Sequence, residues 1–282
     1  MLGTVQLGLN YGINNQQGKP SRDEAFQILS YAGKQGIKTL DTAQAYGDAI
    51  DVIGAFHKTN DPFDVVTKIT HSEDLNVSEY VQQLIKKLNV QKLQAVLLHK
   101  FSDLTEHKEL LHSLLELKEK GWINKIGVSV YTNEELILSC YKKEIDLIQL
   151  PFNLLDNYSL RSAGIKEAVK NNKILHVRSV FLQGLFFMPL QSLPSLLEPL
   201  KPYLNMLREI SHEQNISLNA LALKYVLQTA EIDGVLIGVD SASQLKSNLS
   251  FVDDIPLSQS MITRINSIQC ASPHLLNPVN WK

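Results

Sequence analysis

Short apolar runs that alternate with helical stretches are the feature of this sequence that most restricts its fold. Eight such runs read as continuous Val, Ile and Leu rather than as an alternating pattern, which is typical of strands covered on both faces. They lie at residues 3–7, 37–40, 64–69, 93–98, 125–130, 146–150, 174–180 and 234–239. The pattern therefore predicts repeated βα units around a parallel sheet.

The stretches between these runs carry the marks of helices. Capping boxes, in which Ser or Thr precedes Glu or Gln by three residues, predict helix starts at several places. They are Ser21 with Glu24, Thr132 with Glu135, and Ser241 with Gln244. Eight βα units in 282 residues predict an α/β fold, the (β/α)8 TIM barrel, as a single domain over residues 1–282.

The interval after the seventh run is too long for one βα connection. Residues 184–202 hold four prolines among bulky apolar residues, which predicts a long loop at the mouth of the barrel. Extra helices are expected at 203–214 and 217–229. The prolines and aromatic end of the C-terminal tail predict a further loop packed at the mouth.

The charge balance narrows the class of partner. Lys and Arg total 27 against 29 Asp and Glu, with no basic run of the kind that binds nucleic acid. The longest apolar stretch is broken by Gln183, Gly184 and Pro189, and no charged leader opens the chain, so neither a membrane span nor a signal peptide is expected. The two cysteines stand far apart, which fits a reducing cytoplasm. We expect a cytoplasmic monomer or weak homo-oligomer that binds a small molecule.

Polar residues of complementary chemistry stand at the ends of the second, third and fourth runs. Asp41 follows the second run and is itself followed by Tyr46, Lys68 lies near the end of the third, and His99 follows the fourth. Because the carboxyl ends of barrel strands meet at one face, we expect these four side chains to form a cluster. No spacing of His, Cys, Asp and Glu in the sequence predicts a metal site.

The four residue types suit the protonation of an oxygen as a hydride arrives at its carbon. A tyrosine with a pKa of about 10 is a poor proton donor near neutral pH unless a cation favours its phenolate. Lys68 would supply that cation, Asp41 would hold Lys68, and His99 would donate a hydrogen bond to a carbonyl oxygen. A Schiff-base lysine of the aldolase type is the alternative for Lys68.

The order Asp41, Tyr46, Lys68 and His99 resembles the catalytic tetrad of the aldo-keto reductase family. Further motifs in matching order are LGTVQLG, GVSV, IQLPFNLLD, SVFLQGL and IGVDSASQLKSNL. The resemblance covers nearly the whole chain. It implies reversible, nicotinamide-dependent reduction of an aldehyde or ketone without a metal, with a small carbonyl compound as substrate.

The resemblance also implies a site for NADP or NAD. The residues carried over to it are Gly3, Thr4, Val5, Ser129, Gln149, Arg178, Ser179, Gln183, Gly238, Asp240, Ser241, Gln244 and Asn248. Ser129 and Gln149 are expected at the nicotinamide carboxamide, and Ser179 and Gln183 near the pyrophosphate. The helix that Ser241 opens is expected at the adenosine end, where its amides can receive a phosphate.

Several positions depart from the family pattern. Val130 stands where many members have an asparagine, and Arg178 where an aromatic ring commonly stacks on the nicotinamide. Asp240 and Gln244 stand where NADP-preferring members place cations, which predicts a weakened preference for NADP. The departures at Val130 and Arg178 leave open a regulatory or redox-sensing subunit that binds the cofactor with little turnover.

Two further sets of residues are weaker leads on the substrate. Polar residues of the loop after the first run, and an aromatic wall later in the chain, would recognise a sugar or another hydroxylated carbonyl compound. They are Tyr11, Asn14, Asn15, Gln16 and Gln17, with Phe152, Asn153 and Tyr158. His71 lies just past Lys68 and is a candidate for lining the same pocket.

Overall fold

The strands form one parallel sheet that closes into a barrel. The computed structural model describes residues 1–252 and 255–281. The eight strands pair in chain order. They are β1 (Leu2–Gly3), β2 (Thr39–Asp41), β3 (Asp64–Ile69), β4 (Leu93–Leu98), β5 (Ile123–Ser129), β6 (Leu147–Pro151), β7 (Ile174–Arg178) and β8 (Gly234–Val235). The predicted α/β barrel is confirmed.

The barrel closes between its first and last strands. The backbone N–H of Gly3 donates to the carbonyl of Ile237 at 2.8 Å, and the terminal ammonium of Met1 donates to the carbonyl of Val235 at 3.0 Å. Leu2 and Ile237 form a parallel bridge. These bonds satisfy the edges of β1 and β8, so neither is left as an open strand edge.

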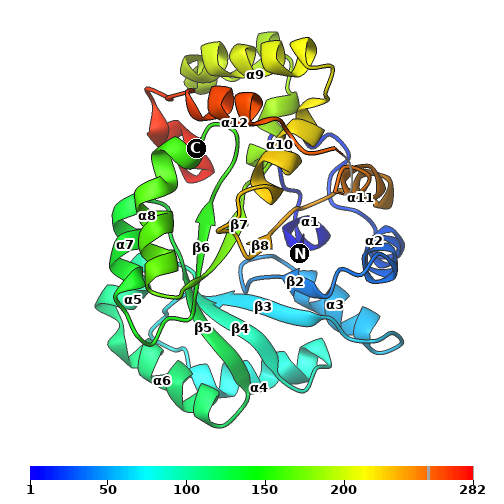
Figure 1. Cartoon of the computed structure of the whole chain (residues 1–282). Helices are drawn as coiled ribbons and strands as arrows, with labels where there is room; N and C mark the ends of the chain where they lie inside the picture. The colour runs from blue at the N-terminus through cyan, green and yellow to red at the C-terminus, as the bar shows by residue number, and fades with distance from the viewer. Residues whose placement is uncertain (253–254, 282) are drawn as a thin grey trace.

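Helices surround the strands on the outside of the barrel, as Figure 1 shows. The α-helices are α1 (Val5–Gly8), α2 (Arg22–Lys34), α3 (Ala49–His57), α4 (Val77–Leu88), α5 (Phe101–Glu106), α6 (Lys108–Glu119), α7 (Asn133–Cys140), α8 (Tyr158–Lys170), α9 (Lys201–Glu213), α10 (Leu218–Leu227), α11 (Ala242–Leu249) and α12 (Gln259–Asn266). The 3₁₀ helices are η1 (Leu182–Phe187), η2 (Leu190–Ser192), η3 (Ser195–Leu200), η4 (Pro273–Leu276) and η5 (Pro278–Trp281). The extra helices α9 and α10 match the two expected after the seventh strand.

All three predicted N-caps are followed by a helix, and the reciprocal capping box is complete in two of them. The reciprocal bonds of Ser21 with Glu24 and of Thr132 with Glu135 are both formed. At α11 the Ser241 hydroxyl accepts from the backbone of Gln244, but the Gln244 side-chain oxygen accepts from the backbone N–H of Asp240 instead of that of Ser241. The third box is therefore incomplete, because the glutamine reaches one residue too far back.

Several predicted strand bounds were wrong for local reasons. The expected strand at 3–7 ends at Gly3, because the N–H and hydroxyl of Thr4 both bond to the carbonyl of Asp41 and the chain turns into α1. The strand expected at 174–180 ends at Arg178, since Ser179 has a φ of 63°, in the left-handed region. The strand expected at 234–239 forms a ladder with β7 only over Gly234–Val235, and beyond it Ile237 makes a single bridge to Leu2 before the chain turns toward α11. The region 184–202, expected as a loop, is largely 3₁₀ helix.

Inside the barrel, polar residues near the carboxyl ends of the strands lie one layer above a small apolar cluster. Val66, Ala95, Leu97 and Leu147 form a small cluster separate from the larger core between strands and helices. Side chains two residues apart on a strand share a face, so positions two residues after this cluster also face inward, toward the carboxyl ends of the strands. Lys68 on β3, His99 after β4 and Gln149 on β6 occupy these positions.

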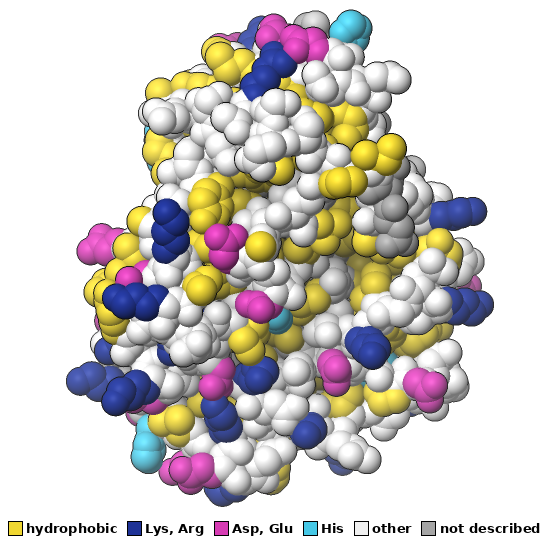
Figure 2. All heavy atoms as spheres, viewed as in Figure 1, with side chains coloured by type: hydrophobic (Ala, Val, Ile, Leu, Met, Phe, Trp, Pro, Cys, Tyr) yellow, Lys and Arg dark blue, Asp and Glu magenta, His cyan; other side chains and the backbone are white. Residues whose placement is uncertain are grey.

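The outer surface shows no face of one charge in the view of Figure 2, where Lys and Arg are interspersed with Asp and Glu. Among residues 1–252 and 255–281, no helix has both the length and the apolar character needed to cross a bilayer.

Candidate active site

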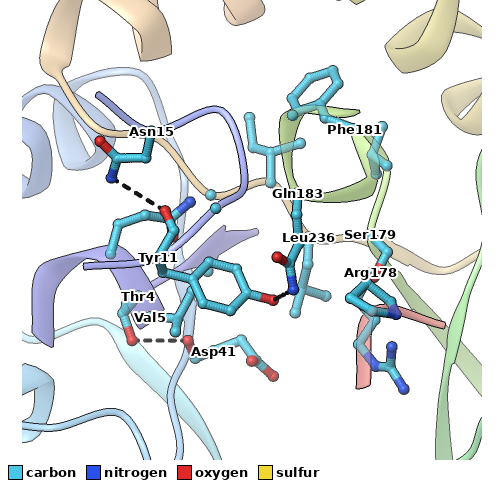
Figure 3. Close-up of a pocket in the computed structure, with 18 of the residues that line it drawn as sticks. Thr4, Val5, Tyr11, Asn15, Asp41, Arg178, Ser179, Phe181, Gln183 and Leu236 are labelled. Atoms are coloured by element: carbon cyan, nitrogen blue, oxygen red, sulfur yellow. Dashed lines mark hydrogen bonds between the residues drawn. The ribbon is translucent and has the colours of Figure 1, made fainter. Parts of the chain in front are cut away.

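A cavity of about 630 Å³ opens at the carboxyl ends of the strands. Every residue expected at the catalytic and cofactor sites lines it except Gln149 and Ser241. Figure 3 shows that its walls come from separate segments, with Thr4 and Tyr11 on one side and Arg178 and Ser179 on the other. The barrel thus brings the sequence-predicted residues together at one place.

The base of the cavity is a buried ion pair between Lys68 and Asp41. The Lys68 ammonium donates to Oδ1 of Asp41, and both side chains are at most 3% exposed. Burial disfavours the ammonium, but the charge and hydrogen bond of Asp41 together with Tyr46 outweigh this cost, and the pKa of Lys68 is raised above its ordinary value. Lys68 therefore stays protonated throughout the neutral range.

Gln149 supports this pair from the opposite strand. Its Nε2 donates to Oδ2 of Asp41 at 2.9 Å, which fixes the amide orientation because a carboxylate repels the amide oxygen. Oε1 of Gln149 has no hydrogen-bond partner within the described part of the chain. Gln149 lies behind Asp41 rather than on the cavity wall. Its position on β6 explains this placement, which its sequence motif alone did not reveal.

Tyr46 lies next to the buried ammonium. Nζ of Lys68 stands 5.4 Å from the centre of the Tyr46 ring, and Tyr46 lines the cavity. The backbone of this segment is held by the Tyr46 N–H, which donates to the carbonyl of Ala43 at 3.1 Å. The turn after β2 therefore presents the phenol beside a buried cation.

His99 completes the expected cluster. Its backbone N–H donates to the carbonyl of Ile69 at 2.8 Å, which extends the β3–β4 pairing by one residue. Burial, followed by the positive charges of Lys68 and Arg178, lowers the pKa of His99 to about 4. The imidazole is therefore neutral at pH 7 and can donate one N–H hydrogen bond without carrying a charge.

Arg178 lies across the cavity and stacks on a tyrosine. Its guanidinium carbon is 4.2 Å from the centre of the Tyr131 ring, and its NH2 donates to the carbonyl of Val130 at 3.1 Å and to Ser129 Oγ at 3.4 Å. Arg178 thus carries its own aromatic partner, Tyr131. Arg178 adds a second positive charge to the site, which is seen in its effects on Lys68 and His99.

The polar loop after β1 spans the cavity at two points. Tyr11 accepts a hydrogen bond from Nε2 of Gln183 at 3.0 Å, and Asn15 donates to Oδ1 of Asp240 at 3.3 Å. Figure 3 shows the Tyr11 ring extending from one wall toward Gln183 on the other. Burial raises the pKa of Asp240, whereas its hydrogen bond with Gln244 opposes this effect.

The expected aromatic wall was wrong. Phe152 is buried against Tyr225, with ring centres 5.5 Å apart, and Asn153 donates to the carbonyl of Ser179. Tyr158 donates its hydroxyl to Glu231 outside the cavity. Of the polar loop, Tyr11, Asn14 and Asn15 line the cavity, whereas Gln16 and Gln17 do not. His71, which was also expected at the cavity, does not line it either.

Sequence reasoning missed other cavity residues. Tyr131 directly follows the fifth strand and its neighbour Val130, so its place past a strand end was a usable signal. Gln6 lies in α1 and Asn219 in α10, where no strand-end pattern indicates them. The expectation that the tail packs at the mouth is confirmed by Pro278 and Val279, which line the cavity.

The cavity residues fit a nicotinamide dinucleotide. Oε1 of Gln6, a residue of the cavity wall, is a buried acceptor without a partner among the described residues, as a ligand amide would require. A Cβ added at Gly238 would come within 2.4 Å of the Gln6 amide, so a larger residue there would displace the Gln6 side chain from its present position. At the far end, Ser241 and the first amides of α11 can receive a phosphate.

Comparisons with known proteins agree with this geometry. A profile of the Aldo/keto reductase family matches residues 1–269. The chain is 28% identical over 144 residues to norsolorinic acid reductase B of Dothistroma septosporum, covering 43% of this chain and 37% of that protein. It is 25% identical over 188 residues to aldo-keto reductase YhdN of Bacillus subtilis, covering 61% of this chain and 55% of that protein. Each match spans less than two thirds of the curated relative.

Solved structures share the fold. The glycerol dehydrogenase AKR11B4 of Gluconobacter oxydans superimposes with a TM-score of 0.75 at 20% identity, covering 98% of this chain and 92% of the other. The holo form of aldo-keto reductase AKR11C1 of Bacillus halodurans gives 0.75 at 21% identity, covering 95% and 91%. Fold, cavity residues and family profile coincide over nearly the whole sequence, and the chain therefore belongs to the aldo/keto reductase family.

Proposed function

We propose that this chain is an NAD(P)H-dependent oxidoreductase that reduces an aldehyde or ketone to the alcohol, with Tyr46 as the proton donor. The observation that carries the proposal is the buried Lys68–Asp41 pair beside the Tyr46 ring, 5.4 Å from ring centre to Nζ. A buried lysine that a carboxylate keeps charged can stabilise the phenolate that forms when the neighbouring tyrosine gives up its proton. Membership of the family supports the same class of reaction and a nicotinamide cofactor.

The residues divide the work of proton transfer between them. A bound nicotinamide cofactor would supply the hydride. Tyr46 gives its phenolic proton to the substrate oxygen, and Lys68 stabilises the phenolate that remains. Neutral His99 donates a hydrogen bond to the same oxygen and fixes its position, while Asp41 keeps Lys68 charged.

A Schiff base on Lys68 is disfavoured by the same contacts. An amine nucleophile must lose its proton, whereas Asp41 holds the Lys68 ammonium and raises its pKa. The ammonium also donates a hydrogen bond to the carbonyl of Thr42, 3.5 Å away.

A hydroxylated carbonyl compound is the substrate class that the lining favours. Tyr11, Asn14 and Asn15 place hydroxyl and amide groups along one wall, and Arg178 adds hydrogen-bond donors on the other. Phe181 and Phe187 supply an apolar part of the lining. Such a mixture suits a sugar-like chain better than a purely apolar aldehyde.

The decisive experiment measures turnover and binding in parallel. The purified chain is mixed with NADH or NADPH and a panel of aldehydes that includes hydroxylated and apolar members, and cofactor oxidation is followed by absorbance. Steady oxidation that depends on the aldehyde supports the reductase. Tight cofactor binding by fluorescence titration, with no oxidation for any aldehyde, would instead support a cofactor-sensing subunit.

A further inference from the structure

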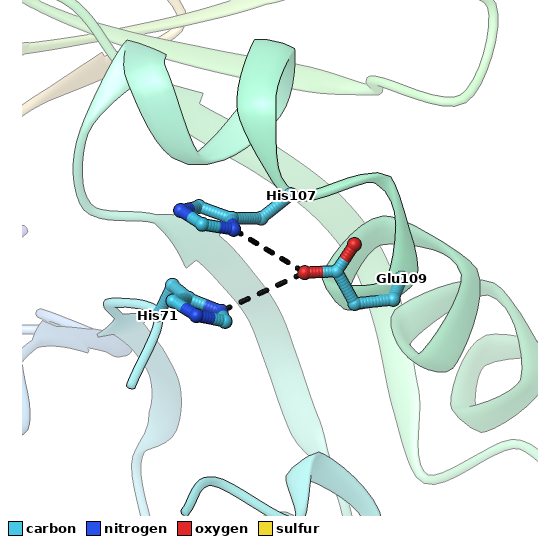
Figure 4. Close-up of side chains that lie close together, drawn as sticks. All are labelled: His71, His107 and Glu109. Atoms are coloured by element: carbon cyan, nitrogen blue, oxygen red, sulfur yellow. Dashed lines mark ion pairs between the residues drawn. The ribbon is translucent and has the colours of Figure 1, made fainter. Parts of the chain in front are cut away.

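A cluster of two histidines and a glutamate lies outside the cavity. His71 follows β3, His107 caps the start of α6, and Glu109 lies in the first turn of that helix (Figure 4). Nδ1 of His107 is 3.3 Å from Oε1 of Glu109, and Nδ1 of His71 is 3.7 Å from the same oxygen. A ligand atom from each of the three residues lies within 4.8 Å of the others.

The two distances from the imidazole nitrogens to the carboxylate oxygen are close to those between atoms bound to one metal ion. Ligands about 2.1 Å from a tetrahedral zinc ion stand roughly 3.4 Å apart. Imidazole nitrogens and a carboxylate oxygen are also the ligand types that zinc and its neighbours in the transition series prefer. Three protein ligands leave a fourth position for water.

We propose that His71, His107 and Glu109 form a binding site for a divalent transition-metal ion of the zinc type. The ion joins the segment after β3, the strand that carries Lys68, to the connection after β4 that begins with His99. The site is distinct from the cavity, and the proposal does not depend on the reductase reaction.

The side chains are accessible and suitably charged for this role. His71 and His107 are 30% and 31% exposed, and Glu109 is 66% exposed, so an ion reaches them directly from solvent. A glutamate carboxylate is ionised at neutral pH and can bind a cation there. No other hydrogen bond of either imidazole is formed within the described part of the chain.

Metal binding requires a local rearrangement of the two rings. They stack with centres 3.6 Å apart and an angle of 4° between their planes, so their nitrogen lone pairs run side by side. Each ring must turn about its Cβ–Cγ bond for the lone pairs to converge. Partial exposure allows this rotation without disturbing the core, and stacking holds the rings close together until an ion binds.

The test is a calorimetric titration of zinc chloride into the full chain after removal of any histidine tag. We expect one zinc ion per chain. His71→Ala and His107→Ala should each weaken binding by at least about tenfold, as loss of a coordinating or supporting group does. His112→Ala is the matched control, since His112 is an exposed histidine of the same helix α6 and pairs with Glu116 instead of Glu109.

Two results would overturn the proposal. One is the absence of zinc binding to the wild-type chain, and the other is equal zinc affinity of the wild type and His71→Ala. Melting temperatures measured in a chelator check that the variants fold. If an alanine variant is destabilised, His71→Gln and His107→Gln, which retain most of the side-chain volume, are titrated in its place.

Discussion

The two ends of the cavity hold carboxylates in opposite ways. At the base, Asp41 is almost fully buried and binds Lys68 and Gln149, two side chains that come from inward positions of strands. At the rim, Asp240 is partly exposed and binds Asn15 and Gln244, which come from a loop and a helix start. The barrel strands fix the positions of the side chains at the base, whereas the side chains at the rim lie on connections between strands, which can move more easily.

This difference separates the reaction that we propose at the base from the selection of the cofactor that we propose at the rim. Strand-borne groups are held by the sheet ladder on both sides, so their geometry is fixed before any ligand arrives. Groups on loops carry fewer constraints and change with less cost to the fold. Substitutions at the base should therefore have large effects on rate and stability, and those at the rim should have small effects on preference.

The largest effect is expected for Tyr46→Phe, which keeps the ring and removes the donated proton. The rate of the chemical step should fall by roughly 10²-fold to 10⁴-fold, as for the loss of a general acid. Single-turnover oxidation of the cofactor measures the step, and cofactor affinity should change little. Tyr31→Phe on α2 is the control, and an unchanged rate in Tyr46→Phe would remove Tyr46 from the mechanism.

The next effect concerns the buried pair. Asp41→Asn leaves the Lys68 ammonium without its counter-charge, which should lower the free energy of unfolding by about 3 kcal/mol and move the alkaline limb of the pH–rate profile to lower pH. Urea titration measures the first and steady-state kinetics the second. Asp48→Asn, in the exposed pair with Lys19, should cost less than about 1 kcal/mol. Similar losses in both variants would contradict the contrast between buried and exposed pairs.

An acid-stability measurement tests the neutral state of His99. An unfolded histidine takes up a proton below about pH 6.5, whereas the folded pKa of His99 is about 4. Between these values the unfolded state binds more protons, so the free energy of unfolding should fall as the pH falls, by about 1.4 kcal/mol per unit from this residue. The loss stops below the folded pKa. His99→Gln should flatten this limb and His112→Gln should not; equal slopes in all three proteins would show that His99 is charged in the folded state.

The smallest effect is expected at the rim. A carboxylate near a 2′-phosphate disfavours NADPH by on the order of 1 kcal/mol, or about fivefold. Asp240→Arg should therefore raise the ratio of kcat/KM for NADPH to that for NADH by at least this factor, with one aldehyde as substrate. Asp61→Arg, an exposed position away from the cavity, controls for net charge. A ratio that is the same in Asp240→Arg and wild type would place Asp240 away from the adenosine ribose.

The same contrast explains which features could be predicted from the sequence. Lys68 and His99 follow apolar strands, so the period of two residues and the common direction of the strands place them together without knowledge of the loops. Gly3 and Arg178 ended their strands earlier than expected because Thr4 and Ser179 adopt local turns that hydropathy does not reveal. The stacking of Arg178 on Tyr131 could not be predicted, because it depends on how the side chain of a residue beyond the strand end packs.

Contacts between connections could not be predicted. His71 and His107 come together only because the segments after β3 and β4 are adjacent in the barrel, and no spacing in the sequence marks the pair. Phe152 was expected at the cavity but packs on Tyr225 of α10 instead. An aromatic residue after a strand can be buried either in the cavity or against the helices outside it, and the sequence does not distinguish the two.

The Asp41–Lys68–Gln149 chain ties three strands across the barrel interior, and this constrains how the protein can change over generations. A substitution that separates the lysine from its carboxylate leaves a buried charge unpaired, so it weakens the fold as well as the proposed reaction. Selection for a folded barrel then preserves these residues even in a lineage that no longer needs their chemistry. Descendants can drift at the rim while the base persists.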